Sequence, residues 1–408
     1  MERCYVARRQ VVGWGGLPSG AVPPIDAEPP ANSDASPSRA AAPSKDAGSA
    51  TGVTRGGDTK EPRSVSDPRE PGATTQDTGI GAESGAGARA GDAAGARGKS
   101  GPSWGLTRGF LVTNLVLQVV IAVTGSVVRV TGSGLGCPTW PNCFPGSLVP
   151  IEHPELAWFH QWIEFGNRLL SGVVGLVALL CFVLVWLHRP RRQRLTRLAA
   201  ATLLVTISQG VIGGITVLAG LVWWTVAGHF LVSMVLVWLA VLLVRAQFES
   251  DDAVRPLVPA ALRQLLVVST VVLGGVLVVG TMVTGAGPHA GDAETARLNV
   301  SVSGLAQAHA DLLFLYLGLL IAFGFALRAV GAPRGVWRAY AWLIVTVLAQ
   351  GSIGMVQYLT GVPEALVSLH VLGAALVTLA MGNVWAATGD RGVAAGRPEL
   401  VAEDARRG

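Results

Sequence analysis

Residues 209–229 read QGVIGGITVLAGLVWWTVAGH, and residues 350–370 read QGSIGMVQYLTGVPEALVSLH. In both stretches a Gln-Gly-x-Ile-Gly element is followed by a glycine and then by a histidine, in the same register and without a gap. Each stretch is apolar on both sides of a short turn, Gly220 in one and residues 361–363 in the other. This pattern predicts two antiparallel hairpins of membrane-spanning helices. The repetition predicts two similar helical units in tandem.

Long runs of Leu, Val, Ala and Gly alternate with short charged loops from Gly105 onward, which is typical of a polytopic helical membrane protein. Weaker similarities extend the repeat, because Val130-Thr-Gly-Ser-Gly134 resembles Val283-Thr-Gly-Ala-Gly287 and His160 matches His309. We therefore predict an all-α membrane protein whose eight transmembrane helices form two tandem four-helix bundles related by pseudo-twofold symmetry. The predicted spans are 107–129, 156–187, 198–219, 221–246, 264–285, 305–328, 339–360 and 364–388.

The chain divides into four parts by composition. Residues 1–104 are rich in Ala, Gly, Ser, Pro, Asp and Arg, with almost no Leu, Ile or Phe. Such a segment buries too little apolar surface to offset its ordering entropy, so we predict a disordered tail. It has no apolar stretch typical of a signal peptide. The four-helix units then span 105–250 and 251–388, and residues 389–408 form a second tail.

Arginines set the expected orientation. They gather in residues 188–197, 245–263 and 328–338, which the positive-inside rule places in the cytoplasm together with both termini. The 130–155 and 286–304 loops then face outward. All lysines lie in the tail, at Lys45, Lys60 and Lys99, and the net charge is +5. We relate this charge to membrane orientation, so we expect membrane lipid and no nucleic acid among the partners.

Four histidines occupy matching positions toward the outer side, two in each unit: His160, His229, His309 and His370. Two imidazoles that face each other across a four-helix bundle are typical of a bis-axial haem site. The alternative for a single intramembrane histidine is a hydrogen bond between helices. No Cys or carboxylate cluster accompanies the four histidines to complete a zinc-type site. The repeat therefore favours haem iron as the metal they bind.

Glu164 is a carboxylate inside an apolar helix, a costly arrangement that usually serves function. We predict a catalytic or proton-handling role for it. The alternative is a purely structural pair with Arg168, which lies four residues later. Arg129 and Arg168 both flank the outer membrane region, where arginine suits a haem propionate, although Arg129 is equally suited to anchoring its helix at the interface. Gln209 and Gln350 are expected to form hydrogen bonds between helices.

Cys137 and Cys143 flank a Pro-Thr-Trp-Pro-Asn loop on the predicted outer face. That compartment permits disulfides, so we predict an S–S bond that closes the loop. Active redox chemistry is the alternative. Cys181 lies in a predicted span and is expected in the core, and we assign no role to Cys4 or to three further histidines, His153, His188 and His289.

The sequences TGSGLGCPTWPNC (131–143) and EFGNR (164–168), the repeated QGxIG element and the late histidines resemble haem A synthase over residues 105–388. The resemblance implies a bacterial plasma-membrane enzyme that oxidises the C8 methyl group of haem O to a formyl group, giving haem A for cytochrome oxidase. It implies a substrate haem in the first unit, a haem b cofactor in the second, and a catalytic role for Glu164. Haem O synthase and an electron acceptor are the further partners we expect.

Two positions depart from the family pattern. Many members have a ligand histidine three residues after the glutamate, where this chain has Asn167, and the matching position in the second unit is Tyr316. Here His160 and His309 stand seven residues earlier than those positions, about 10 Å nearer the surface. His229 and His370 follow the pattern, so the residue that completes each axial pair stays open.

Two other functions would use the same features. A dihaem b-type electron carrier needs the histidines but gives Glu164 no chemical task. A haem-handling transporter or scaffold would suit the tandem repeat. It predicts a polar path, whereas the predicted spans contain few charged side chains beyond Glu164, Arg168 and Asp311.

Overall fold

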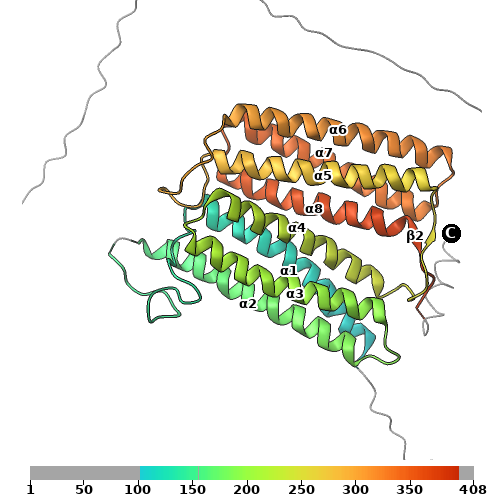
Figure 1. Ribbon diagram of the computed structural model, residues 1–408, viewed down its shortest axis with the longest axis horizontal. Helices are drawn as coiled ribbons and strands as arrows, with labels where there is room; N and C mark the ends of the chain where they lie inside the picture. The colour runs from blue at the N-terminus through green and yellow to red at the C-terminus, as the bar shows by residue number, and fades with distance from the viewer. Residues whose placement is uncertain (1–101, 155, 395–408) are drawn as a thin grey trace, which may run out of the picture. The chain divides into compact units, whose positions relative to one another are not determined.

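The computed structural model describes residues 102–154 and 156–394. Within them the chain folds into eight long helices, and all eight are long and apolar enough to cross a membrane (Figure 1). They are α1 (Trp104–Val130), α2 (Trp158–Leu187), α3 (Gln193–Leu218), α4 (Trp223–Ala246), α5 (Ala260–Ala286), α6 (Val302–Ala329), α7 (Arg334–Leu359) and α8 (Glu364–Ala387). The predicted all-α membrane fold is confirmed. The disorder predicted for the N-terminal tail falls almost wholly outside the described residues.

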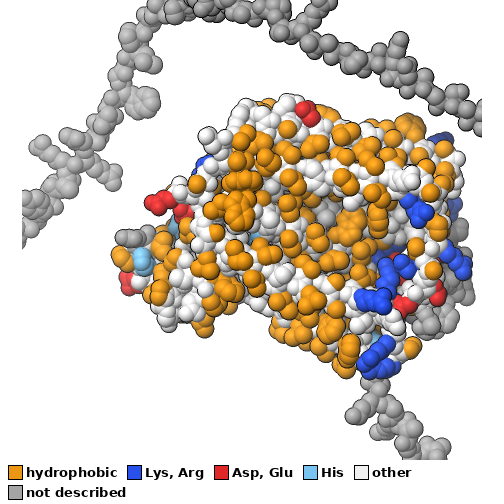
Figure 2. All heavy atoms as spheres, in the orientation of Figure 1, with side chains coloured by type: hydrophobic (Ala, Val, Ile, Leu, Met, Phe, Trp, Pro, Cys, Tyr) orange, Lys and Arg blue, Asp and Glu red, His pale blue; other side chains and the backbone are white. Residues whose placement is uncertain are grey.

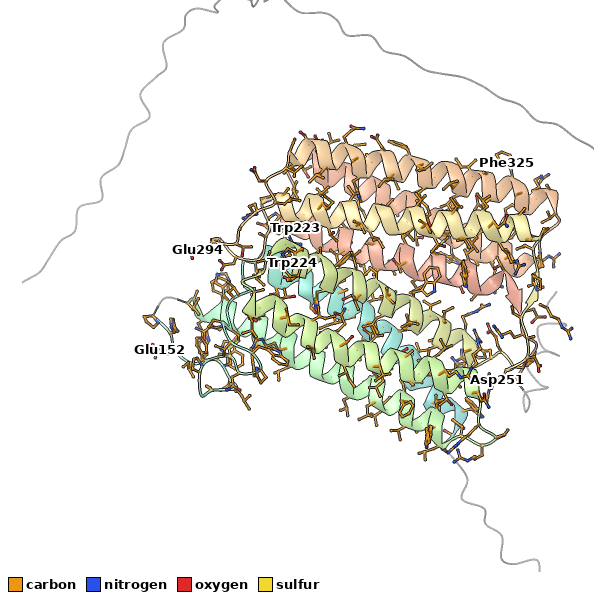
Figure 3. The ribbon with its side chains drawn as sticks, viewed as in Figure 1. Glu152, Trp223, Trp224, Asp251, Glu294 and Phe325 are labelled. Carbon is orange, nitrogen blue, oxygen red and sulfur yellow. A yellow bond between two sulfur atoms is a disulfide. The ribbon has the colours of Figure 1, made fainter. Side chains whose placement is uncertain are left out.

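The surface of the helices is apolar, as a lipid environment requires. Figure 2 shows hydrophobic side chains across the visible face, with the Lys and Arg side chains gathered mainly at one end. Phe325, on α6, is 72% exposed and illustrates this lipid-facing surface. Figure 3 shows Glu152, Glu294, Trp223 and Trp224 at one end of the helices and Asp251 at the other. We call these the outer end and the arginine-rich end.

Three helices, α1, α4 and α8, form the centre of the described part of the chain. α1 packs against α2, α4 and α8, and α4 packs against α3, α5 and α8. The remaining pairs, α5 with α6 and α7 with α8, complete the second half of the chain (Figure 1). A core cluster that includes Val119, Val237 and Ala375 joins the two halves through α1, α4 and α8. The histidine-bearing helices α4 and α8 therefore lie inside the assembly.

The two hairpins end in the same backbone turn. Gly220 and Gly361 adopt the left-handed conformation, with φ of 67° and 77°. The next residues, Leu221 and Val362, are also left-handed, and each donates its N–H to the carbonyl five residues earlier at 2.9 Å. Glycine accepts this conformation without steric cost, and these bonds satisfy helix-terminal carbonyls. The repeated glycine thus marks a repeated turn.

The arginine-rich end is tied together by the chain's two short strands, β1 (Arg255–Pro256) and β2 (Gly389–Asp390). They pair antiparallel, with Arg255 opposite Asp390. An ion pair of 2.5 Å joins Arg194, at the start of α3, to Glu249 after α4. The segment that links the two halves is therefore held by α3 and by the residues after α8.

Candidate haem and disulfide-loop site

The structure brings His309 of α6 and His370 of α8 together. Their ring centroids lie 6.3 Å apart, with 60° between the ring planes. Nδ1 of His309 lies 3.0 Å from the carbonyl oxygen of Val276 on α5. A proton on Nδ1 satisfies this contact and leaves Nε2 with a free lone pair, as a metal ligand requires. Gly280 makes room for this ring, because a Cβ there would lie 3.0 Å from its Cε1.

This pair fits an iron porphyrin. A metal ion between two imidazole nitrogens, each at about 2.0–2.1 Å, separates the ring centroids by about 6 Å. Nδ1 of His370 is buried and has no hydrogen-bond partner among the described residues. The described residues contain no group of three His, Cys, Asp or Glu side chains that could hold a metal ion by themselves. Two opposed imidazoles without further protein ligands suit haem better than zinc.

The Gln-Gly-x-Ile-Gly element explains how His370 is positioned. Nε2 of Gln350, on α7, donates a hydrogen bond of 2.8 Å to the backbone carbonyl of His370. A Cβ at Gly354, one turn later, would lie 2.9 Å from Cε1 of the His370 ring, too close for a real side chain. The glutamine therefore fixes the histidine's backbone, and the glycine leaves space for its ring.

The same glutamine and glycine contacts recur at His229 on α4. Nε2 of Gln209 donates to the carbonyl of His229 at 2.9 Å and to the hydroxyl of Ser233 at 2.7 Å. A Cβ at Gly213 would lie 3.3 Å from Cε1 of His229. Nδ1 of His229 is buried and unpartnered among the described residues, as in His370. The hydrogen bonds predicted for the two glutamines are confirmed.

The histidines of the first half do not meet in this way. His160 lies at the start of α2, and its Nδ1 is 2.8 Å from the hydroxyl of Ser133. Within the described part of the chain, its ring contacts Phe159 and makes no ring contact with His229. Asn167, two turns further along α2, accepts a hydrogen bond of 2.8 Å from Thr124 of α1. His229 therefore has no imidazole opposite it at the spacing seen in the second half.

Glu164 is 4% exposed and holds the outer loop of the first half. Its Oε2 accepts a hydrogen bond from the backbone N–H of Cys137 at 2.7 Å. Its Oε1 pairs with Arg168 at 2.5 Å. A disulfide joins Cys137 to Cys143, as the sequence predicted. The carboxylate thus lies directly beneath a covalently closed loop.

Arg168 completes this arrangement from below the loop. It donates to the backbone carbonyls of Cys137 at 2.7 Å, Thr139 at 2.8 Å and Asn142 at 3.1 Å. Three carbonyls and one carboxylate surround the guanidinium, so its charge is compensated. Glu164 and Arg168 together bind the loop at both ends of the disulfide.

Arg129 lies where the two halves meet at the outer end. Its Nη2 donates to the carbonyl of Thr284 on α5 at 3.0 Å, and its Nε is buried without a partner among the described residues. Arg297, from the outer loop of the second half, lies close enough to interact with it electrostatically. Within the described residues neither arginine pairs with a carboxylate. The sequence did not single out Arg297, because only the fold brings it to Arg129.

Comparisons with known proteins agree with the motifs. A sequence profile of the family described as cytochrome oxidase assembly protein (COX15-CtaA) matches residues 108–296. A haem A synthase from Shouchella clausii is 33% identical over 156 residues, which cover 38% of this chain and 50% of the relative. One from Shewanella oneidensis is 30% identical over 179 residues, 40% and 53% of the two chains. One from Lysinibacillus sphaericus is 35% identical over 144 residues, 35% and 45% of the two chains.

The chain spans about half the length of the curated relatives it matches. The family match includes the disulfide loop, Glu164, Arg168 and His229, and it stops before His309 and His370. Residues 108–296 are thus similar to the family described as cytochrome oxidase assembly protein, and the chain is similar to these haem A synthases over part of their length.

Proposed function

We propose that this chain is a haem A synthase, an oxidoreductase that converts the C8 methyl group of haem O to a formyl group. The observation that carries the proposal is the His309–His370 pair, 6.3 Å between centroids, in a chain whose first half matches this family. In this proposal the pair would hold an iron porphyrin between α6 and α8. We then assign the binding of the substrate, haem O, to the first half of the chain.

The reaction sets what the site must provide. A methyl group that becomes a formyl group with oxygen from water releases electrons and protons in two successive oxidations. An electron acceptor is therefore a required partner, and we propose haem O synthase as the supplier of substrate. The chain must supply a proton acceptor near the methyl group and admit the one water that reacts while excluding bulk solvent.

We propose that the second half binds haem b, which supplies one-electron transfer when bound. His309 and His370 are the axial ligands in this proposal. The carbonyl of Val276 orients the His309 ring, and Gln350 holds the backbone of His370. Such contacts to the far side of a ligand fix its ring and its tautomer.

We propose that the first half binds haem O with His229 as an axial ligand. His160 is the second candidate ligand, because a proton on its Nδ1 would satisfy the Ser133 contact and leave the lone pair of Nε2 free. Arg129 suits a propionate, because its guanidinium has an unpartnered nitrogen and Arg297 adds a second cation. Arg168 is engaged by the loop and by Glu164. We propose that Arg168 acts at the haem site through Glu164.

Glu164 is the proposed catalytic residue. In the ionised form its carboxylate would accept the protons that the reaction releases. The Cys137 N–H and Arg168 fix both carboxylate oxygens, so the carboxylate stays in one orientation. The two proposed units span 105–250 and 251–388, in a bacterial plasma membrane with both termini in the cytoplasm.

A dihaem electron carrier is the second candidate. The observation in its favour is that Glu164 already has a structural task, holding the Cys137 N–H and Arg168, so the residue needs no chemistry to account for it. The test is extraction and chromatography of haem from cells that lack haem A synthesis, supplied with haem O, with and without this chain. Haem A that depends on the chain and disappears in Glu164→Gln establishes the enzyme. Bound haem b without haem A, at full expression, establishes the carrier.

A further inference from the structure

A cavity of about 440 Å³ lies at the arginine-rich end, far along the helices from the disulfide loop. It is bounded by the end of α4, the start of α7 and the segment from α8 into β2. Its polar lining consists of Arg245, Arg338, Asn383 and Asp390. Trp342 and Leu257 contribute apolar walls. None of these residues belongs to the proposed haem sites.

The cavity carries net positive charge. Arg338 is exposed and forms no ion pair within the described part of the chain. Arg245 has one carboxylate near it, Glu249 at 3.9 Å, and that carboxylate is already paired with Arg194 at 2.5 Å. Two arginines therefore face one acidic side chain, Asp390. An anion with several acceptor oxygens would satisfy them.

Asp390 is itself partly compensated. Its Oδ1 accepts the backbone N–H of Gly392 at 2.8 Å, and Arg255 stands opposite it in the strand pair. The carboxylate of Asp390 therefore repels an anion in the cavity less strongly than an unpaired aspartate would. The remaining positive charge can bind one negative group between Arg245 and Arg338.

The apolar wall distinguishes this cavity from a site for a soluble anion. Trp342 is 65% exposed and follows Arg338 by one helical turn, so both side chains lie on one face of α7. Val345, nearly one turn further, is 56% exposed on the same helix. Along α7 the order is therefore arginine, tryptophan and aliphatic side chain. A bilayer has the matching order of charged headgroups, interface and hydrocarbon. Basic pockets between transmembrane helices bind lipid headgroups in this way.

We propose that this cavity binds the phosphate headgroup of an anionic phospholipid, with Arg245 and Arg338 on the phosphate and the acyl chains along Trp342 and Val345. The site joins the C-terminal ends of α4 and α8 to the start of α7. A bound lipid would therefore bridge the two halves of the chain at the end opposite the haem sites. The proposal is independent of the haem chemistry.

The test measures lipid affinity of the full-length protein in detergent by native mass spectrometry. Phosphatidylglycerol and phosphatidylcholine are titrated onto the wild type, onto Arg245→Gln/Arg338→Gln and onto the matched control Arg263→Gln/Arg328→Gln. The control removes two exposed arginines from the same end, outside the cavity. We expect the cavity variant to bind phosphatidylglycerol about tenfold more weakly and the control to stay within about twofold of the wild type.

Phosphatidylcholine should bind weakly and equally to all three proteins. Equal weakening in the cavity variant and the control would overturn the proposal, because general surface charge would then explain binding. Displacement of phosphatidylglycerol by an equal concentration of inorganic phosphate would overturn it in favour of a soluble anion. Gel filtration of each variant verifies the fold, and Arg338→Lys, which keeps the charge, should recover part of the affinity.

Discussion

The backbone N–H of Cys137 donates a hydrogen bond to Oε2 of Glu164, with 2.7 Å between the nitrogen and the oxygen. This bond connects a carboxylate within a transmembrane helix to one end of a disulfide. A change in the loop therefore reaches the proposed catalytic residue directly through this contact and indirectly through Arg168. Glu164 serves both as a loop anchor and as the proposed base, and the two roles can be separated experimentally.

Arg168→Gln should destabilise the first half more than Glu164→Gln does. The arginine variant leaves a buried carboxylate and three loop carbonyls without their cation, whereas the glutamine at 164 can still accept the Cys137 N–H. Loss of one partner of a buried pair costs about 3–5 kcal/mol. Thermal unfolding in detergent measures the difference. Equal midpoints for the two variants would show that the pair does not hold the loop.

His370→Ala and His309→Ala should each lower bound haem b, by about tenfold in affinity, because either change leaves one axial imidazole. A pyridine haemochrome assay of the purified protein measures the haem content. His289→Ala is the matched control, since its Nε2 contacts the Val362 carbonyl at 2.9 Å at the outer end. Unchanged haem b in both ligand variants would place the cofactor elsewhere.

Gly354→Ala should weaken haem binding by the second half while the fold persists. The added Cβ would lie 2.9 Å from Cε1 of His370 and would push the ring out of position. Gly351→Ala is the control on the same helix, because its Cβ would meet only Leu313, at an ordinary 3.6 Å. The control should gain about 0.5–1 kcal/mol of helix stability. Similar haem spectra in both variants would contradict the role assigned to Gly354.

Cys137→Ser/Cys143→Ser should lower the stability of the loop by about 2 kcal/mol, the chain-entropy estimate for so short a ring. Arg168 still binds the carbonyls of Cys137, Thr139 and Asn142, so the loss should be smaller than in Arg168→Gln. Thermal midpoints and haem A yield are measured together. Lost haem A with an unchanged midpoint and haem content would assign the cysteines a redox role.

The stability of the arginine-rich end should fall at mildly acidic pH. His188 stacks on Trp104 with 3.8 Å between centroids and lies 2.8 Å from the Thr107 hydroxyl. Burial, and then the charge of Arg192, lower the pKa of His188 below its usual 6.5. The unfolded chain therefore takes up a proton at higher pH than the folded chain. The stabilising contribution is complete above pH 6.5 and is lost as the pH falls below it.

Unfolding midpoints at pH 7.5 and 5.5 measure this effect, and His188→Gln is the control. Glutamine can still contact Thr107 and does not titrate in this range. The variant's midpoint should depend less on pH than the wild type's. An identical pH dependence in both proteins would exclude His188 as the cause.

Local sequence pattern predicted the eight spans, because each is a long apolar run between charged loops. Three helices begin four or five residues earlier than predicted: α3 begins at Gln193, α5 at Ala260 and α7 at Arg334. Arginines in these first turns resemble loop residues in a hydropathy pattern. A membrane helix can extend beyond its apolar run, because charged side chains at its end are solvated.

The contacts around the site depended on the fold. The spacing of Glu164 and Arg168 predicted their pair, since residues four apart share a helix face. It did not predict that Arg168 would reach three carbonyls of the disulfide loop. Arg297 approaches Arg129 across 168 residues of chain, a contact that no local pattern encodes. The His309–His370 spacing likewise required the fold to bring α6 and α8 across from each other through their shared neighbours α5 and α7.

The pairing of β1 with β2 has a consequence for how the chain is made. The N–H of Ala394 donates to the carbonyl of Phe248, and the N–H of Ser250 donates to Gly392. The backbone hydrogen bonds of the segment between α4 and α5 can therefore form completely only after the last described residues have left the ribosome. Until then the first four helices are complete while their connection to the rest stays open. This short ladder can close only after α8 has been made, and a chain that terminates after α8 would never form it.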